Sequence, residues 1–120
     1  MHDDTDADPL ERLRGLCGLL PEVAEIDSLG RPTFRVAIKA FVAFEETDGR
    51  AMVIVKLPVD EQVALVAREG FRAEDETGGH GWTVVDVGTV GWDEIDRLVV
   101  AGYRLVAPSH LVSRLDALLG

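Results

Sequence analysis

The sequence predicts a two-layer α+β domain, in which an antiparallel sheet of about five strands carries helices on one face. Three observations lead to this prediction. Apolar residues alternate with other residues from Thr33 to Glu45, an Asp48-Gly49 pair follows, and four segments show apolar residues at helical spacing. Alternation with a period of two is typical of a strand with one buried face, and Asp-Gly favours a two-residue hairpin turn.

Composition supports a single domain. The chain has 120 residues, of which 47% are apolar and 28% charged, with a formal net charge of −10. This apolar content excludes disorder over the whole chain, and no uncharged apolar run is long enough to span a membrane. We expect residues 1–8 to form a disordered acidic tag and residues 9–120 to form the domain. The lone cysteine and the absence of a secretory signal favour a cytoplasmic protein.

The first half of the chain predicts one helix and three strands. A stripe of apolar residues predicts a helix over residues 9–20, where Cys17 would be a small buried apolar residue. The alternating run is long for one strand, so we expect a break near Lys39. Strands of about 40–46 and 51–57 should then flank the Asp48-Gly49 turn. The resulting register pairs Thr47 with Arg50, Phe44 with Val53, Val42 with Val55 and Phe41 with Lys56.

The second half predicts helix, strand, strand, helix and helix. Residues 58–69 read as a helix, residues 71–73 and 82–87 as strands, and two more helices begin near Trp92 and after Pro108. The complete order is therefore α-β-β-β-α-β-β-α-α. The Gly-rich stretch that contains His80 is expected to be a plain turn, because it matches neither a phosphate-binding loop nor a zinc-ligand spacing.

Several segments resemble the MmcQ/YjbR family. They include Gly30-Arg31-Pro32-Thr33-Phe34-Arg35-Val36, Trp92-Asp93-Glu94 and, most strongly, Gly102-Tyr103-Arg104-Leu105-Val106-Ala107-Pro108. The matches run in order from about residue 8 to residue 120. The resemblance implies a double-wing, CyaY-like α+β fold and the DNA-binding role usually given to the family. The sequence departs from the family pattern at Ala37 and Ile38, where glycine is frequent, and at Ser109 and His110, where basic residues are typical.

The register predicts a basic patch on the sheet face opposite the core, formed by Arg35, Lys39 and Lys56. Phe41 should lie beside these cations, and Arg31 would extend the patch. Such a patch can bind phosphates while the aromatic ring packs on a sugar or base. The alternative is a solvated face whose cations pair with Glu45 and other carboxylates.

Three functions remain open at this stage. The first is weak DNA binding through the basic patch, by a protein that is not an enzyme and needs no cofactor or metal. The second is a protein- or peptide-interaction module of chaperone-like type that binds no nucleic acid, which the net charge of −10 also fits. The third is small-molecule binding between sheet and helices. No nucleophile–base arrangement indicates an enzyme.

Overall fold

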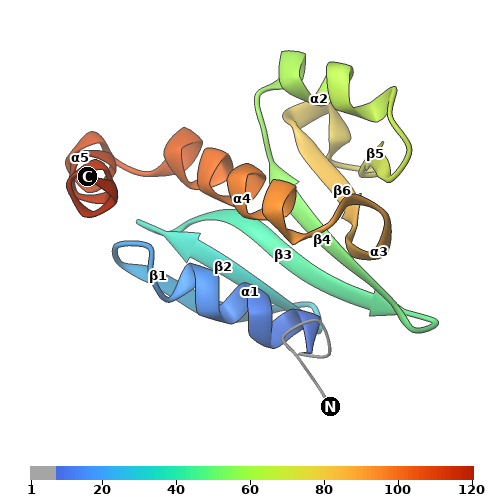
Figure 1. The fold of residues 1–120 in the computed structure, drawn as a ribbon, viewed down its shortest axis with the longest axis horizontal. Helices are drawn as coiled ribbons and strands as arrows, with labels where there is room; N and C mark the ends of the chain where they lie inside the picture. Colours follow the sequence, from blue (N-terminus) through green and yellow to red (C-terminus); the bar gives the residue numbers. More distant parts are fainter. Residues whose placement is uncertain (1–7) are drawn as a thin grey trace.

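Six antiparallel strands form one twisted sheet in the computed structural model, which describes residues 8–120 (Figure 1). The spatial order is β1-β2-β3-β4-β6-β5, so the first four strands are consecutive hairpins and β6 lies between β4 and β5. The strands are β1 (Val23–Ser28), β2 (Arg31–Val36), β3 (Lys39–Thr47), β4 (Arg50–Lys56), β5 (Phe71–Ala73) and β6 (Trp82–Asp86).

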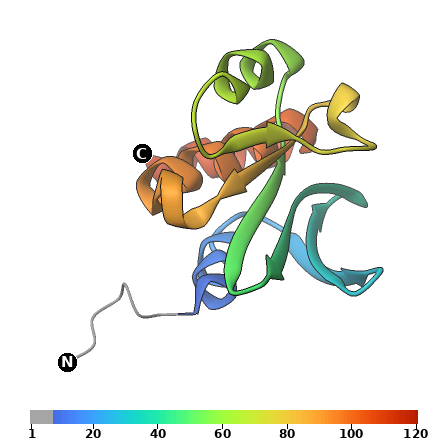
Figure 2. The same ribbon diagram turned by 90° about the vertical axis from the view of Figure 1, so that its right-hand side faces the viewer.

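Helices cover one face of this sheet and one of its ends. They are α1 (Pro9–Cys17), α2 (Val59–Val66), the 3₁₀ turn η2 (Gly78–His80), α3 (Val87–Val90), α4 (Trp92–Val106) and α5 (Ser109–Leu119). α1 and α4 lie against the same face, and α2 packs beside β5 (Figures 1 and 2). Among residues 8–120, no helix lies over the opposite side of the sheet, between β2–β3 and β5–η2 (Figure 2).

The predicted fold class is confirmed, and so is the predicted hairpin. Across β3 and β4, Thr47 pairs with Arg50, Phe44 with Val53 and Val42 with Val55. β1 was not predicted, because its residues are half-buried or exposed and therefore lack a clear apolar alternation. The last strand ends one residue before the predicted Val87, because the Asp86 side chain accepts a hydrogen bond from the Gly88 amide and begins α3 there.

The predicted acidic tag, residues 1–8, lies almost wholly outside the described residues. Of residues 1–8, only Asp8 is described, and it is the N-cap of α1. Its carboxylate accepts a hydrogen bond from the Leu10 amide over 3.0 Å. Within the described part of the chain, no helix is both long enough and apolar enough to cross a membrane.

A β-bulge in β3 changes the face on which Phe41 lies. Phe34 pairs with Val42 while Arg35 pairs with Ala40, which leaves Phe41 as an extra residue opposite β2. The Phe41 side chain is completely buried on the helix-covered face, and its ring lies edge-on to Tyr103 with 5.6 Å between centroids. The prediction that Phe41 lies on the open face is therefore wrong, because the bulge shifts the alternation by one residue.

α4 lies close to the sheet because one of its residues has no side chain. A Cβ at Gly102 would come within 2.9 Å of the Val55 side chain and 3.0 Å of the Lys56 carbonyl oxygen. The next residue, Tyr103, is fully buried and donates a hydrogen bond from its hydroxyl to the Pro21 carbonyl over 2.8 Å. This bond fastens α4 to the segment that connects α1 with β1.

The turn between β2 and β3 has a backbone that its residues disfavour. Ala37 and Ile38 have φ of 50° and 63°, the combination of a type I′ hairpin turn. A left-handed conformation costs an L-residue roughly 1–2 kcal/mol, and more for a β-branched one. Ile38 is 84% exposed, so packing of its side chain does not offset this cost. These are the two positions where the resembled family often has glycine.

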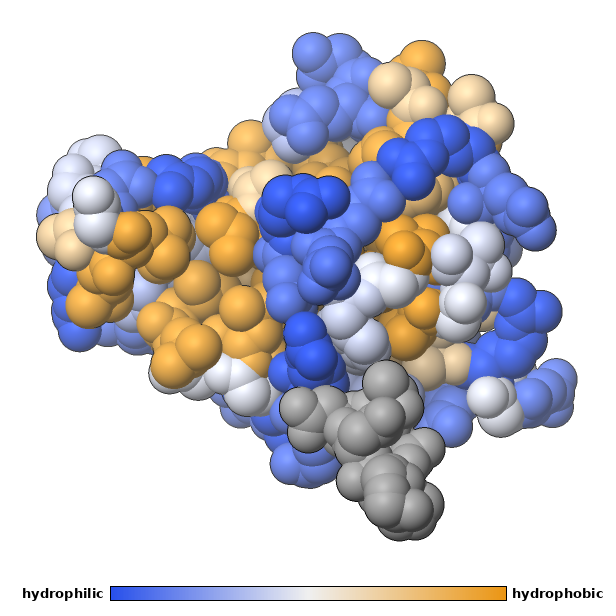
Figure 3. Space-filling model, in the orientation of Figure 1, coloured by the Kyte–Doolittle hydropathy of each residue, from blue (hydrophilic) through white to orange (hydrophobic). Residues whose placement is uncertain are grey.

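Apolar surface also remains outside the core. Leu105 on α4 and Leu118 and Leu119 on α5 are each 45% exposed or more. Figure 3 shows apolar surface gathered on the side of the molecule where α5 and the end of α4 lie. The described part of the chain therefore leaves one margin of its helix layer uncovered.

Candidate functional site

The open face of the sheet carries its own small apolar strip. Ala43, Ile54 and Val84 follow one another across β3, β4 and β6, and each is at most 4% exposed. Met52 and Trp82 pack beside them, and this cluster is separate from the main core. Charged side chains rather than a helix border the strip. It is therefore a sheet face whose apolar residues are sheltered without a covering layer.

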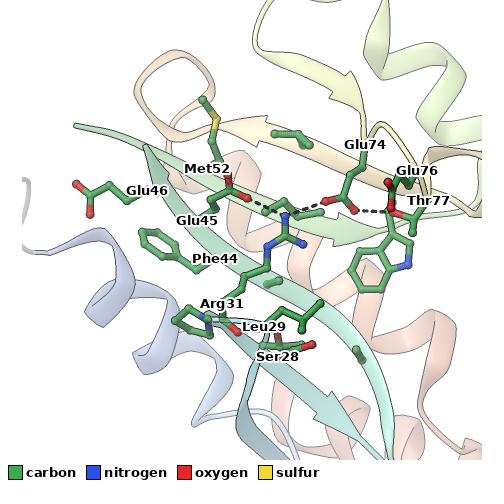
Figure 4. A pocket seen from close by; sticks show the side chains of 18 of the residues that line it. Ser28, Leu29, Arg31, Phe44, Glu45, Glu46, Met52, Glu74, Glu76 and Thr77 are labelled. Atoms are coloured by element: carbon green, nitrogen blue, oxygen red, sulfur yellow. Dashed lines mark hydrogen bonds and ion pairs between the residues drawn. The ribbon is translucent and has the colours of Figure 1, made fainter. Parts of the chain in front are cut away.

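The strip forms the floor of an open groove of about 990 Å³ (Figure 4). One wall is the β1–β2 turn with the start of β2, and the other is the segment that follows β5. The first wall includes Leu29 and Arg31, and the second includes Glu74, Glu76 and Thr77 (Figure 4). A groove of this size with an apolar floor and polar walls has the usual character of a ligand-binding site.

Arg31 spans the groove between two carboxylates. Its Nη2 atom lies 2.7 Å from an oxygen of Glu45 and 2.9 Å from one of Glu74. Glu45 is on β3, directly beside β2, whereas Glu74 follows β5 at the far edge of the sheet. Burial alone would lower the pKa of Arg31, but its hydrogen bonds with the two carboxylates outweigh burial and raise that pKa. The same hydrogen bond with Arg31 lowers the pKa of Glu45.

The groove as a whole is acidic. Its lining includes five carboxylates and two guanidinium groups, a balance of −3, and these groups are Glu45, Glu46, Glu74, Asp75, Glu76, Arg31 and Arg72. Arg72 is 3.8 Å from Asp75, so both guanidinium groups of the lining lie beside carboxylates. Phosphates would meet net repulsion here, whereas a cationic group would be attracted.

The predicted basic patch does not gather on one face. Arg35 pairs with Ala40 and Lys56 pairs with Trp82, which places both cations on the open face. Lys39 instead pairs with Val36, which is fully buried in the helix-side core, and directly paired residues project to the same side of a sheet. Placing Lys39 with the other two was wrong, because the alternation reverses at the Phe41 bulge.

Within residues 8–120, Arg35, Lys39 and Lys56 form no ion pair. Arg31, the remaining cation predicted to bind nucleic acid, is paired on both sides. The alternative of cations paired with Glu45 and other carboxylates therefore describes Arg31 correctly. Phe41, the aromatic member of the prediction, is inaccessible from the open face.

Trp82, at one end of the strip, is held in place by buried polar contacts. The Gln62 side-chain amide donates to the Trp82 carbonyl over 3.0 Å and lies 3.1 Å from the Thr83 hydroxyl. Gly81, just before this strand, has a φ of 97°, and a Cβ there would overlap the carbonyl oxygen of Leu57. Both features fix where β6 begins, so the indole is presented on a rigid element.

The remaining polar candidates lie away from the groove or inside the core. Cys17 is only 2% exposed, and burial, with a smaller contribution from Glu25, raises the pKa of its thiol to about 12. This agrees with its predicted role as a small core residue. His80 lies in the 3₁₀ turn η2 and is exposed. Among the described residues, no group of three or more histidine, cysteine or carboxylate side chains is arranged to bind a metal.

Four groove residues went unnoticed in the sequence, namely Met52, Glu74, Glu76 and Trp82. Of these four, only Met52 could have been placed from the sequence, because the predicted register of β3 and β4 pairs it with Glu45. Glu74 meets Arg31 across 43 residues of sequence, through the placement of β5 at the sheet edge. No local pattern predicts that meeting.

Comparisons with known proteins agree with this fold. The YjbR family model matches residues 19–105. The crystal structure of Deinococcus radiodurans protein DR2400, which has the family domain DUF419, aligns with a TM-score of 0.72 and 19% identity, covering 81% of this chain and 77% of that one. At this identity the likeness concerns the fold alone. No curated protein matches the chain, and neither description above names an enzymatic activity. Because the family model spans more than half of the sequence, the chain belongs to the YjbR family.

Proposed function

We propose that this protein is a non-enzymatic interaction module whose open sheet face binds a segment of a partner protein. The observation that carries the proposal is the apolar strip of Ala43, Ile54 and Val84, which forms the floor of a groove of about 990 Å³. An apolar sheet face is ordinarily packed against another layer. Here the three strip residues are at most 4% exposed, and the half-buried Met52 and Trp82 at the margin are the apolar side chains that a ligand contacts first.

DNA binding is the second candidate, and it rests on fewer observations. In its favour, Arg35 and Lys56 share the open face and have no ion-pair partner within residues 8–120. Against it, the groove lining has a balance of −3, and the whole chain has a net charge of −10. Affinity for nucleic acid depends mainly on neutralising phosphates with cations. We therefore favour a polypeptide ligand.

The test begins with a displayed library of random 12-residue peptides selected against the purified protein. We expect the selected peptides to be rich in aliphatic and aromatic residues and to bind in solution by fluorescence anisotropy. Met52→Lys places a charge at the margin of the apolar strip and should weaken binding at least tenfold. Val63→Lys makes a comparable change on the exposed side of α2, where Val63 is 63% exposed, and should leave binding unchanged.

Two results would contradict this function. One is a failure to select any peptide, and the other is equal binding by the wild type and the Met52→Lys variant, with Met52→Gln as a second groove variant should Met52→Lys unfold. In parallel, labelled duplex and single-stranded DNA are titrated at about 50 and 200 mM salt. DNA affinity that falls with salt and with the Arg35→Ala/Lys56→Ala double substitution would favour the second candidate instead.

A further inference from the structure

The centre of the groove already contains one cation, and its surroundings indicate which ligand the groove accepts. The Arg31 guanidinium bridges Glu45 of β3 at 2.7 Å and Glu74 of the wall that follows β5 at 2.9 Å (Figure 4). The side chains of Arg31 and Glu74 are 33% and 20% exposed, so the bridge lies partly within the groove. A planar guanidinium between two carboxylates above an apolar floor is a well-defined binding geometry.

The Arg31 side chain can leave this position without disturbing the core. Arg31 begins β2, directly after the β1–β2 turn, and its paired residue is Ser28 at the end of the edge strand β1. Its backbone is held independently, because the Thr33 hydroxyl donates to the Arg31 carbonyl over 3.0 Å. Rotation of the side chain would therefore break only the two ion pairs. It would leave two carboxylates facing each other across the groove.

Charge complementarity then selects the occupant. With Arg31 turned away, the groove retains five carboxylates around the strip of Ala43, Ile54 and Val84. The ordinary glutamate pKa of 4.5 lies well below neutral pH, so Glu45 needs no cation beside it to be ionised. A ligand that brings a cation to this point restores the pairing that Arg31 provided, and a ligand without one leaves the carboxylates unpaired beside an apolar surface.

Building on the function proposed above, we propose that the bound segment of the partner contains an arginine flanked by apolar residues. Its guanidinium displaces that of Arg31 from Glu45 and Glu74, and its neighbours pack on the strip beside Met52 and Trp82. Arg31 then competes with the ligand for Glu45 and Glu74. A ligand that pairs only weakly with these carboxylates does not displace it. Arginine is favoured over lysine because a guanidinium already occupies this position, where the Arg31 Nη2 atom contacts both carboxylates.

The test compares two substitutions that remove the same charge from the same groove. Arg31→Ala removes the proposed competitor, whereas Arg72→Ala removes the groove's other guanidinium, which lies beside Asp75. Arginine-containing peptides from the selection should bind Arg31→Ala at least fivefold more tightly than wild type, and Arg72→Ala no more than about twofold more tightly. Replacing the peptide arginine with citrulline, which keeps the shape and removes the charge, should abolish the gain. Glu45→Gln/Glu74→Gln should weaken binding at least tenfold.

A second measurement needs no selected peptide. N-acetyl-L-arginine methylamide is titrated into ¹⁵N-labelled Arg31→Ala, and amide shifts should appear at Glu45 and Glu74 and be smaller in wild type. Peptides that bind at the Met52 surface without arginine, or equally well with citrulline, would overturn this inference while leaving the proposed function intact. Arginine amide shifts in the absence of any selectable peptide would support the subsite and contradict the function. Equal gains for Arg31→Ala and Arg72→Ala would also overturn the inference, because general charge would then explain them.

Discussion

The two faces of this sheet use the same strands for different purposes. On the helix-covered face, Phe41 and Tyr103 are completely buried against each other, and Gly102 lets α4 approach the strands closely. On the open face, three small or aliphatic residues form a strip bordered by Arg31 and Glu74 and their neighbours. Close packing supplies folding free energy, whereas an apolar strip with ionised walls supplies a surface for recognition. Substitutions on the two faces should therefore have separable effects.

The largest difference is expected for truncation of large side chains. Phe41→Ala removes a fully buried ring and should lower the free energy of unfolding by about 3–5 kcal/mol. Met52→Ala, on the open face, removes a half-buried side chain and should cost about 1 kcal/mol. Urea unfolding followed by circular dichroism measures both. Similar losses for the two variants would mean that Phe41 does not lie on the helix-covered face.

A smaller effect is expected for the buried hydroxyl of the helix-covered face. Tyr103→Phe keeps the ring that packs on Phe41 but leaves the Pro21 carbonyl without its donor. Loss of one partner from a buried hydrogen bond should lower the free energy of unfolding by about 1–2 kcal/mol. Thermal unfolding of the variant checks this value. An unchanged melting temperature would show that the connection between α1 and β1 is stable without this bond.

The smallest effect is expected on the open face and depends on pH. The pKa of Glu45 is lowered by its hydrogen bond with Arg31, so this contribution to stability is complete above the ordinary pKa of 4.5 and is lost as pH falls through the lowered value. Near pH 7 the free energy of unfolding of the wild type should exceed that of Arg31→Met by about 0.2–1 kcal/mol. This difference is small because the ion pair is partly exposed. The difference should shrink as the pH falls below the ordinary pKa of 4.5 and through the lowered pKa of Glu45. A difference that widened on acidification would contradict this.

The fold was largely predictable because much of it is specified locally. The Asp48-Gly49 turn sets the register of β3 and β4 through its own backbone preference, and the pairs Phe44–Val53 and Val42–Val55 follow. The turn at Ala37 and Ile38 has a similar hairpin geometry without suitable residues. Packing of the flanking strands imposes that conformation, and local sequence rules do not reveal it.

The groove was less predictable because it depends on two non-local features. One extra residue at Phe41 reverses the alternation, which separates Lys39 from Arg35 and Lys56. The second feature is the placement of β5 at the sheet edge, which brings Glu74 to Arg31. The proximity of cations to Glu45 could be predicted, because consecutive strands of the predicted sheet lie side by side. Arg31 on β2 therefore lies near Glu45 on β3.

The order of the strands also determines when the groove comes into existence. β1 to β4 are joined by successive short turns, so their contacts span little sequence and can form early in folding. β6 pairs with β4 across the intervening α2 and β5, so this pairing closes a longer loop at a larger entropic cost. One wall of the groove belongs to the early part of the chain and the other to the late part. A chain still emerging from the ribosome with only its first four strands would therefore lack the groove, and ligand binding would become available only when folding is complete.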